Sequence, residues 1–151
     1  MAIVRRAAVI LLTATMMAAA AQPPGLTLAG GARPGSLNIA NRGGGPVTIA
    51  RAIGVERRDR DGWTAVHTEF NAVSSCPIPG RPVLAAKAAV SIPAGGNLKV
   101  VPWQGYTCSG QCENACMADI YLGPGTFRFV ATVLPMGDRV TGLNFAMPPK
   151  H

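Results

Sequence analysis

Glycine and proline divide this chain into short segments. Its 151 residues include 18 glycines and 13 prolines, which fall between short apolar stretches instead of forming one low-complexity tract. Because both residues interrupt regular structure, each apolar stretch is limited to about the length of a strand, and none has the spacing of a convincing amphipathic helix. The sequence therefore predicts an all-β fold of about seven short strands.

The clearest strand signals lie in residues 126–133 and around the Asp61-Gly62 dipeptide. In the first segment Phe127 and Phe129 alternate with other residues, as expected for a strand with one face on a core. The Asp61-Gly62 pair suits a tight turn and predicts a hairpin whose return strand begins at Trp63. We expect Phe127 and Trp63 to fill the core, and His67 to lie at the surface.

The first 21 residues have the pattern of a secretory signal peptide. Arg5 and Arg6 precede an apolar run from Ala7 to Met17, and Ala19-Ala20-Ala21 supplies the small residues of a cleavage site. The run is short for a membrane span, which takes about 20 apolar residues, and no second candidate follows. We therefore expect residues 1–21 to be removed, leaving a periplasmic or secreted protein with no stable membrane insertion.

The remaining chain is long enough for one domain with one core. Its proline- and glycine-rich start predicts a flexible lead-in over residues 22–35, followed by a single β-sandwich domain over residues 36–147. Residues 148–151, Pro-Pro-Lys-His, are expected to form a frayed C-terminus.

The charge pattern argues against a nucleic-acid partner. Without Arg5 and Arg6 the chain has twelve basic and seven acidic side chains, a net charge of +5. The only basic cluster, residues 57–61, is interrupted by acids and is best interpreted as a solvated hairpin tip. A nucleic-acid surface needs a sustained basic face with aromatic side chains for stacking. We therefore predict no nucleic-acid binding.

An even number of cysteines follows the predicted cleavage site. They are Cys76, Cys108, Cys112 and Cys116. In an exported chain this number indicates two disulfides, and four cysteines allow three pairings. We prefer Cys108 with Cys116 and Cys76 with Cys112, and the other pairings stay open. Zinc bound with help from His67 is the rival, but three evenly spaced thiols do not form the two close pairs of structural zinc sites. We predict no metal and no cofactor, and a cysteine-rich loop over residues 105–117.

Catalytic patterns are missing from the sequence. A Ser-His-Asp or Cys-His arrangement would depend on His67 alone, because the other histidine, His151, ends the chain. No Gly-x-Ser-x-Gly, phosphate-loop, dinucleotide or His-Glu-x-x-His motif occurs. We therefore predict that the protein is not an enzyme. Trp103 and Tyr106 are the candidate binding surface for a sugar or peptide, with core or edge packing as the alternative for such aromatic residues.

Several turn and strand motifs follow one another in a characteristic order through residues 36–147. They are the turn after Asn41, the Asp61-Gly62-Trp63 hairpin, Ile92-Pro93-Ala94-Gly95-Gly96, Trp103 with Gly105, and Leu122-x-Pro124-Gly125-x-Phe127-Arg128-Phe129. In this order the chain resembles small immunoglobulin-like domains of exported bacterial proteins. The resemblance implies an antiparallel immunoglobulin-like or fibronectin-like β-sandwich and an extracytoplasmic setting, and it brings no catalytic residues. The cysteine-rich stretch departs from the simplest members.

These observations lead to two functional hypotheses. The first is a non-catalytic exported β-sandwich that acts as a binding or structural module in the periplasm or outside the cell, with an unknown protein or glycan partner. The second is an inhibitor of an extracellular protease or hydrolase that inserts the disulfide-pinned loop 105–117.

Overall fold

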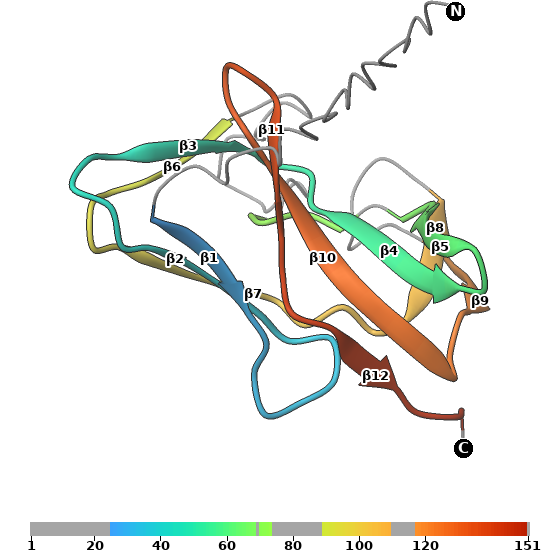
Figure 1. The fold of residues 1–151 in the computed structure, drawn as a ribbon. Coiled ribbons are helices and arrows are strands. Elements are labelled where there is room, and N and C mark those ends of the chain that lie inside the picture. Colours follow the sequence, from blue (N-terminus) through green and yellow to red (C-terminus); the bar gives the residue numbers. More distant parts are fainter. Residues whose placement is uncertain (1–24, 69, 74–88, 110–116, 151) are drawn as a thin grey trace, which may run out of the picture.

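A computed structural model describes residues 25–68, 70–73, 89–109 and 117–150 (Figure 1). The strands in these ranges are β1 (Leu26–Ala29), β2 (Leu37–Asn41), β3 (Val47–Ala50), β4 (Gly54–Asp59), β5 (Gly62–Val66), β6 (Ala89–Ile92), β7 (Asn97–Val100), β8 (Tyr106–Ser109), β9 (Met117–Tyr121), β10 (Gly125–Val133), β11 (Asp138–Thr141) and β12 (Phe145–Met147). The same ranges contain no helix, and so no helix that could cross a membrane. The predicted signal peptide lies outside them.

All pairings between these strands are antiparallel, which confirms the predicted all-β class. One sheet has the order β1-β2-β7, and the largest has the order β5-β4-β10-β3-β6, with β11 and β12 also paired to β10. A third sheet consists of β8 and β9. Strand β10 is the centre of the largest sheet, because β4 lies along one side of it and β11 and β12 along the other.

The described ranges contain twelve strand segments, more than the seven or so that the sequence predicted. Part of the excess arises because two stretches of chain that pair with each other are each interrupted at the same level. Strand β2 pairs with β7, and the next strand β3 pairs with β6. Residues 42–46 and 93–96 therefore lie at the point where both stretches of chain pass from one sheet to the other. The turn expected after Asn41 is this crossing, since β2 and β3 do not pair with each other.

One buried amide holds the two crossing segments together. Asn41 is 1 % exposed, and its Nδ2 donates to the carbonyls of Gly45 (2.8 Å), Ile92 (3.0 Å) and Pro93 (3.2 Å). Its Oδ1 accepts a hydrogen bond from the backbone N–H of Gly43 at 3.0 Å. A buried polar side chain is tolerated only when it is hydrogen-bonded, and this amide uses both of its ends.

The core is a single hydrophobic cluster to which both larger sheets contribute. It includes Leu28, Leu37 and Ile39 from the three-stranded sheet and Ile49, Val55, Ile92, Phe127, Phe129 and Val140 from the largest sheet. Phe127 is completely buried, as predicted, and its ring meets that of Trp103 edge-on with 5.2 Å between centroids.

The prediction that Trp63 fills the core is wrong. Trp63 of β5 is only half-buried and lies opposite Arg58 of β4. The neighbouring Arg57 pairs with the buried Phe127, and successive side chains of a strand point to opposite faces. Arg58 and Trp63 therefore face away from the core.

The sequence had predicted a flexible lead-in over residues 22–35, but residues 26–29 of this segment are a strand. They form β1, which pairs with β2 and buries Leu26 and Leu28. The Leu-Thr-Leu-Ala segment has the alternation of a strand, but it is short and flanked by glycine, so its partner strand decides its structure.

The expected cysteine-rich loop is also partly strand. Residues 106–109 and 117–121 pair as β8 and β9, with an irregularity between Tyr106 and Cys108, and residues 110–116 lie outside the described ranges. After β12, residues 148–150 have no strand structure, although the Pro148 carbonyl accepts a hydrogen bond from the Tyr121 hydroxyl.

Candidate functional site

Of the two aromatic residues predicted as a binding surface, Trp103 lies in the core. Trp103 is 6 % exposed and packs in the core, and its Nε1 donates to the backbone carbonyl of Tyr106 at 3.0 Å. Tyr106 is half-buried, and its ring lies 5.2 Å from that of Tyr121. The structure therefore corrects the prediction for Trp103, because a domain with few aromatic residues uses this ring for packing.

The predicted disulfides fall almost wholly outside the described residues. Cys76, Cys112 and Cys116 lie in the ranges left out, and only the backbone of Cys108, opposite Ala118, can be placed. Both the pairing and the disulfides themselves stay predictions. Among the residues that are described, no group of three or more His, Cys, Asp or Glu side chains gathers, and His67 is exposed.

The structure instead brings together five residues on the outer surface of the largest sheet, and we call this group the arginine face. It consists of Glu56 and Arg58 on β4, Trp63 on β5, Arg128 on β10 and Arg139 on β11. Glu56 lies opposite Arg128 across the β4–β10 ladder, and Arg58 lies opposite Trp63 across the β4–β5 ladder. Strand alternation turns these side chains away from the core.

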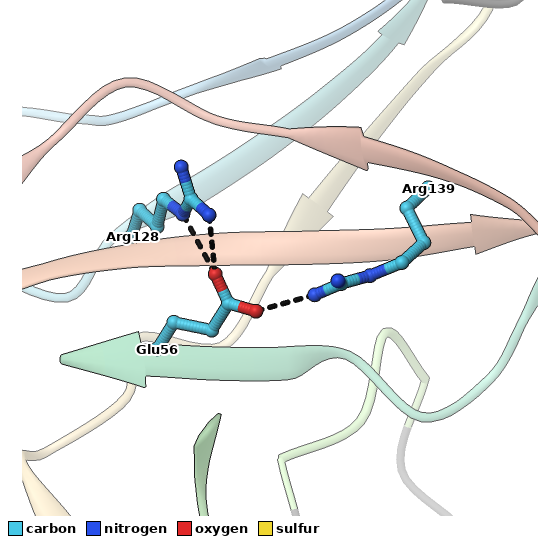
Figure 2. A network of polar contacts seen from close by, with 3 residues as sticks. All are labelled: Glu56, Arg128 and Arg139. Carbon is cyan, nitrogen blue, oxygen red and sulfur yellow. Dashed lines mark hydrogen bonds and ion pairs between the residues drawn. The ribbon is translucent and has the colours of Figure 1, made fainter. Parts of the chain in front are cut away.

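Glu56 is the centre of this group (Figure 2). Its Oε2 accepts a hydrogen bond from Nε of Arg128 at 2.7 Å and forms an ion pair with Nη2 of the same arginine at 2.7 Å, and its Oε1 accepts a hydrogen bond from Nη2 of Arg139. The Glu56 side chain is only 8 % exposed. Burial alone would raise the pKa of this carboxyl, but the hydrogen bonds and positive charges of the two arginines outweigh it and hold the pKa below 4.5.

The ring of Trp63 makes cation–π contacts with two of the arginines, Arg58 and Arg128. The Cζ atom of Arg128 lies 4.3 Å from the centroid of the Trp63 ring, and that of Arg58 lies 5.5 Å from it. A guanidinium group within about 6 Å of an indole ring is attracted by the ring's electrons. Arg128 is thus fixed between a carboxylate and an indole ring.

Arg139 reaches Glu56 across strand β10 (Figure 2). Arg139 lies opposite Thr132, whereas Glu56 lies opposite Arg128, and by strand alternation Val130 lies between these two levels on the same face. Val130 is 4 % exposed although it is absent from the main core cluster. The aliphatic part of a long arginine side chain can cover such a residue while its charged end stays in water. The Arg139 side chain is 59 % exposed.

Stability should depend on pH through Glu56. A carboxyl whose pKa is lowered by folding stabilises the native state above the pKa of the unfolded chain, and this contribution is lost as the pH falls through the native pKa. We expect Glu56→Gln to lower the free energy of unfolding by about 1 to 2 kcal/mol at pH 7. This loss is near the lower end of the range for hydrogen bonds to charged groups, because the exposed Arg139 can be hydrated by water when its partner is removed. The difference from wild type should shrink below pH 4.5.

Urea unfolding of both proteins between pH 7 and pH 3 measures this dependence. Asp59→Asn is the matched control, since Asp59 is an exposed acid on the same strand. A constant difference between wild type and Glu56→Gln at all pH values would contradict the expectation, as would an equal effect of the control.

Sequence reasoning missed the arginine face because most of it is assembled across long separations. The Arg58–Trp63 pair follows from the predicted Asp61-Gly62 hairpin. Arg128 and Arg139, however, are 72 and 83 residues from Glu56 in the chain. Only the position of β10 between β4 and β11 brings them together.

No protein-family model, curated protein or solved structure matched this chain. The function proposed below is therefore derived from its own residues and their geometry.

Proposed function

We propose that this protein is an exported, non-catalytic binding module with an immunoglobulin-like fold, and that the arginine face is its binding surface. The partner is a protein or a glycan in the periplasm or outside the cell. The signal-peptide pattern of residues 1–21 and the even number of cysteines support the compartment. Intact-mass measurement of exported protein should give a chain that begins at or near Gln22.

The order of the strands supports the fold. In immunoglobulin-like sandwiches, strands A, B and E belong to one sheet, and strands C, F and G, with C′ in some domains, to the other. Here β1-β2-β7 has the order A-B-E, and β5-β4-β10-β11 has the order C′-C-F-G. The interrupted pairs β2–β7 and β3–β6 then correspond to the two halves of strands B and E.

The nearly buried Glu56 carboxylate is the observation that carries the functional proposal. Removing a carboxylate from water is costly, and ion pairs at a protein surface contribute only about 0 to 1 kcal/mol. The loss expected for Glu56→Gln includes the cost of leaving Arg128 without its partner, so the ion pair itself is a weak reason for burying an acid on the outer surface of a sheet. Glu56 does, however, fix two guanidinium groups, and one of them stays 59 % exposed. A side chain oriented before binding loses less entropy when a partner arrives.

Binding should depend on the exposed arginines of this face. We expect mature protein to co-sediment with the envelope fraction of the producing cells, or to bind a polymer they release. The double variant Arg58→Gln/Arg139→Gln should stay in the supernatant, since it lacks two exposed cations of the face. The measurement is the bound fraction at increasing amounts of envelope material.

A matched control separates the face from the overall charge of the protein. Arg42→Gln/Lys99→Gln also removes two positive charges, but Arg42 and Lys99 are exposed residues in and beside the β1-β2-β7 sheet. This control should bind like wild type. Equal binding of both double variants, or absence of binding by the wild type, would contradict the proposal.

One observation favours the inhibitor as a second candidate function. Strands β8 and β9 form a sheet separate from the two larger ones, and residues 110–116 connect them. A connection carried on its own hairpin is suited to insertion into an enzyme cleft. If binding survives replacement of the two arginines but is lost when residues 110–116 are replaced by a glycine-serine segment of equal length, the inhibitor is favoured.

A further inference from the structure

The arginine face carries an excess of positive charge. The face holds three guanidinium groups, from Arg58, Arg128 and Arg139, and one carboxylate, that of Glu56, which together give a net charge of +2. The neighbouring acids Asp59 and Asp138 each adjoin one of these arginines in a strand, so the alternation of side chains directs them to the opposite face.

The three guanidinium groups are linked through two shared partners, the Trp63 ring and the Glu56 carboxylate. Arg58 and Arg128 both lie over the ring of Trp63, with Cζ atoms 5.5 Å and 4.3 Å from its centroid. Arg128 and Arg139 contact the two oxygens of one carboxylate. Arg128 is therefore the central group of the three. The Glu56 side chain is nearly buried, whereas that of Arg139 stays 59 % exposed and is accessible to a ligand.

We propose that the arginine face binds a phosphate monoester. This inference deepens the proposed function and rests on it for the biological partner. A phosphate monoester carries about −1.5 to −2 charges at pH 7, which matches the excess charge of the face, whereas a single carboxylate would leave one cation unpaired. The planar guanidinium group also fits phosphate oxygens with two parallel hydrogen bonds, as it does a carboxylate. Arg58 and Arg139 supply the exposed donors, and Arg128, which contacts both Trp63 and Glu56, supplies a fixed charge.

Direct titration of the mature protein tests this site. The probes are inorganic phosphate, glucose 6-phosphate and vesicles containing phosphatidic acid, with succinate as a dicarboxylate of the same charge. We expect saturable binding of at least one phosphate probe, and weaker binding of succinate. Preference for the sugar phosphate or for the vesicles identifies the source of the phosphate group. Calorimetry measures the soluble probes, and co-sedimentation measures the vesicles.

Single variants test the assigned residues. Arg58→Gln and Arg139→Gln should each weaken phosphate binding about tenfold or more, the effect of losing a charge-assisted hydrogen bond. The Arg42→Gln/Lys99→Gln control should bind within about twofold of wild type, because the residues it changes lie away from the face. Circular dichroism and urea midpoints establish that each variant is folded.

The inference is overturned if none of the phosphate probes binds saturably, if succinate binds as tightly as phosphate, or if the control loses as much affinity as the arginine variants. These outcomes differ from failure of the proposed function. If envelope binding depends on Arg58 and Arg139 but no phosphate probe binds, the proposed binding module is supported and a phosphate ligand is excluded. If a phosphate probe binds but the protein does not bind the envelope, the phosphate site is supported and the proposed function is contradicted.

Discussion

Phe127→Ala is expected to lower the free energy of unfolding by about 3 to 5 kcal/mol, the usual cost of truncating a buried aromatic side chain. Phe127 is completely buried on the central strand β10 and packs against Trp103 and Phe145. Its removal leaves a cavity between aromatic rings that backbone pairing on both sides of β10 prevents from collapsing. This loss is a large part of the roughly 5 to 15 kcal/mol that stabilises a typical domain.

Urea midpoints measure the effect of Phe127→Ala, and two variants provide the comparison. Trp63→Ala should cost about 1 to 2 kcal/mol, because Trp63 contributes contacts with two arginines and no part of the main core. His67→Ala, at an exposed position, should change stability by no more than about 0.5 kcal/mol. A loss for Trp63→Ala as large as that for Phe127→Ala would contradict the assignment of Trp63 to the outer surface.

Asn41→Asp is expected to cost about 3 to 5 kcal/mol, although it keeps the shape of the side chain. The change replaces the Nδ2 group by an oxygen, which then faces the carbonyls of Gly45, Ile92 and Pro93 without a proton to share. The new carboxylate must either carry an unpaired charge in a buried site or take up a proton. Both alternatives are unfavourable, and an unsatisfied buried group alone costs about 1 to 3 kcal/mol.

The same chemical change at Asn97 is the control for Asn41→Asp. Asn97 is an exposed residue at the start of β7, so Asn97→Asp should stay within about 0.5 kcal/mol of wild type. A native-like urea midpoint for Asn41→Asp would show that the two crossing segments are held together without the Asn41 amide. Failure of Asn41→Asp to fold, with a normal Asn97→Asp, would agree with the expectation.

Local patterns were informative where a residue's neighbours in the chain are also its neighbours in space. The predicted hairpin joins β4 to β5, although its turn lies at residues 60–61 and the return strand begins at Gly62, and Phe127 and Phe129 alternate inward along β10. The same reasoning failed for Trp63, because a hairpin pattern does not say which of its two faces the core will cover. It failed for residues 26–29, since a four-residue strand becomes evident only beside its partner.

The sequence by itself determined the class of fold: frequent glycine and proline limit the apolar segments to strand length, and alternation within those segments favours antiparallel sheets with one buried face. Only the tertiary structure decided which distant segments meet. Pairing of β10 with β4 and β11 unites Glu56, Arg128 and Arg139, and the crossing of two stretches of chain between the sheets surrounds Asn41 with carbonyl groups. The physical reason is the same in both cases, because a hydrogen bond or ion pair depends on distance in space, and in β-sheets the close partners of a residue are mostly remote along the chain.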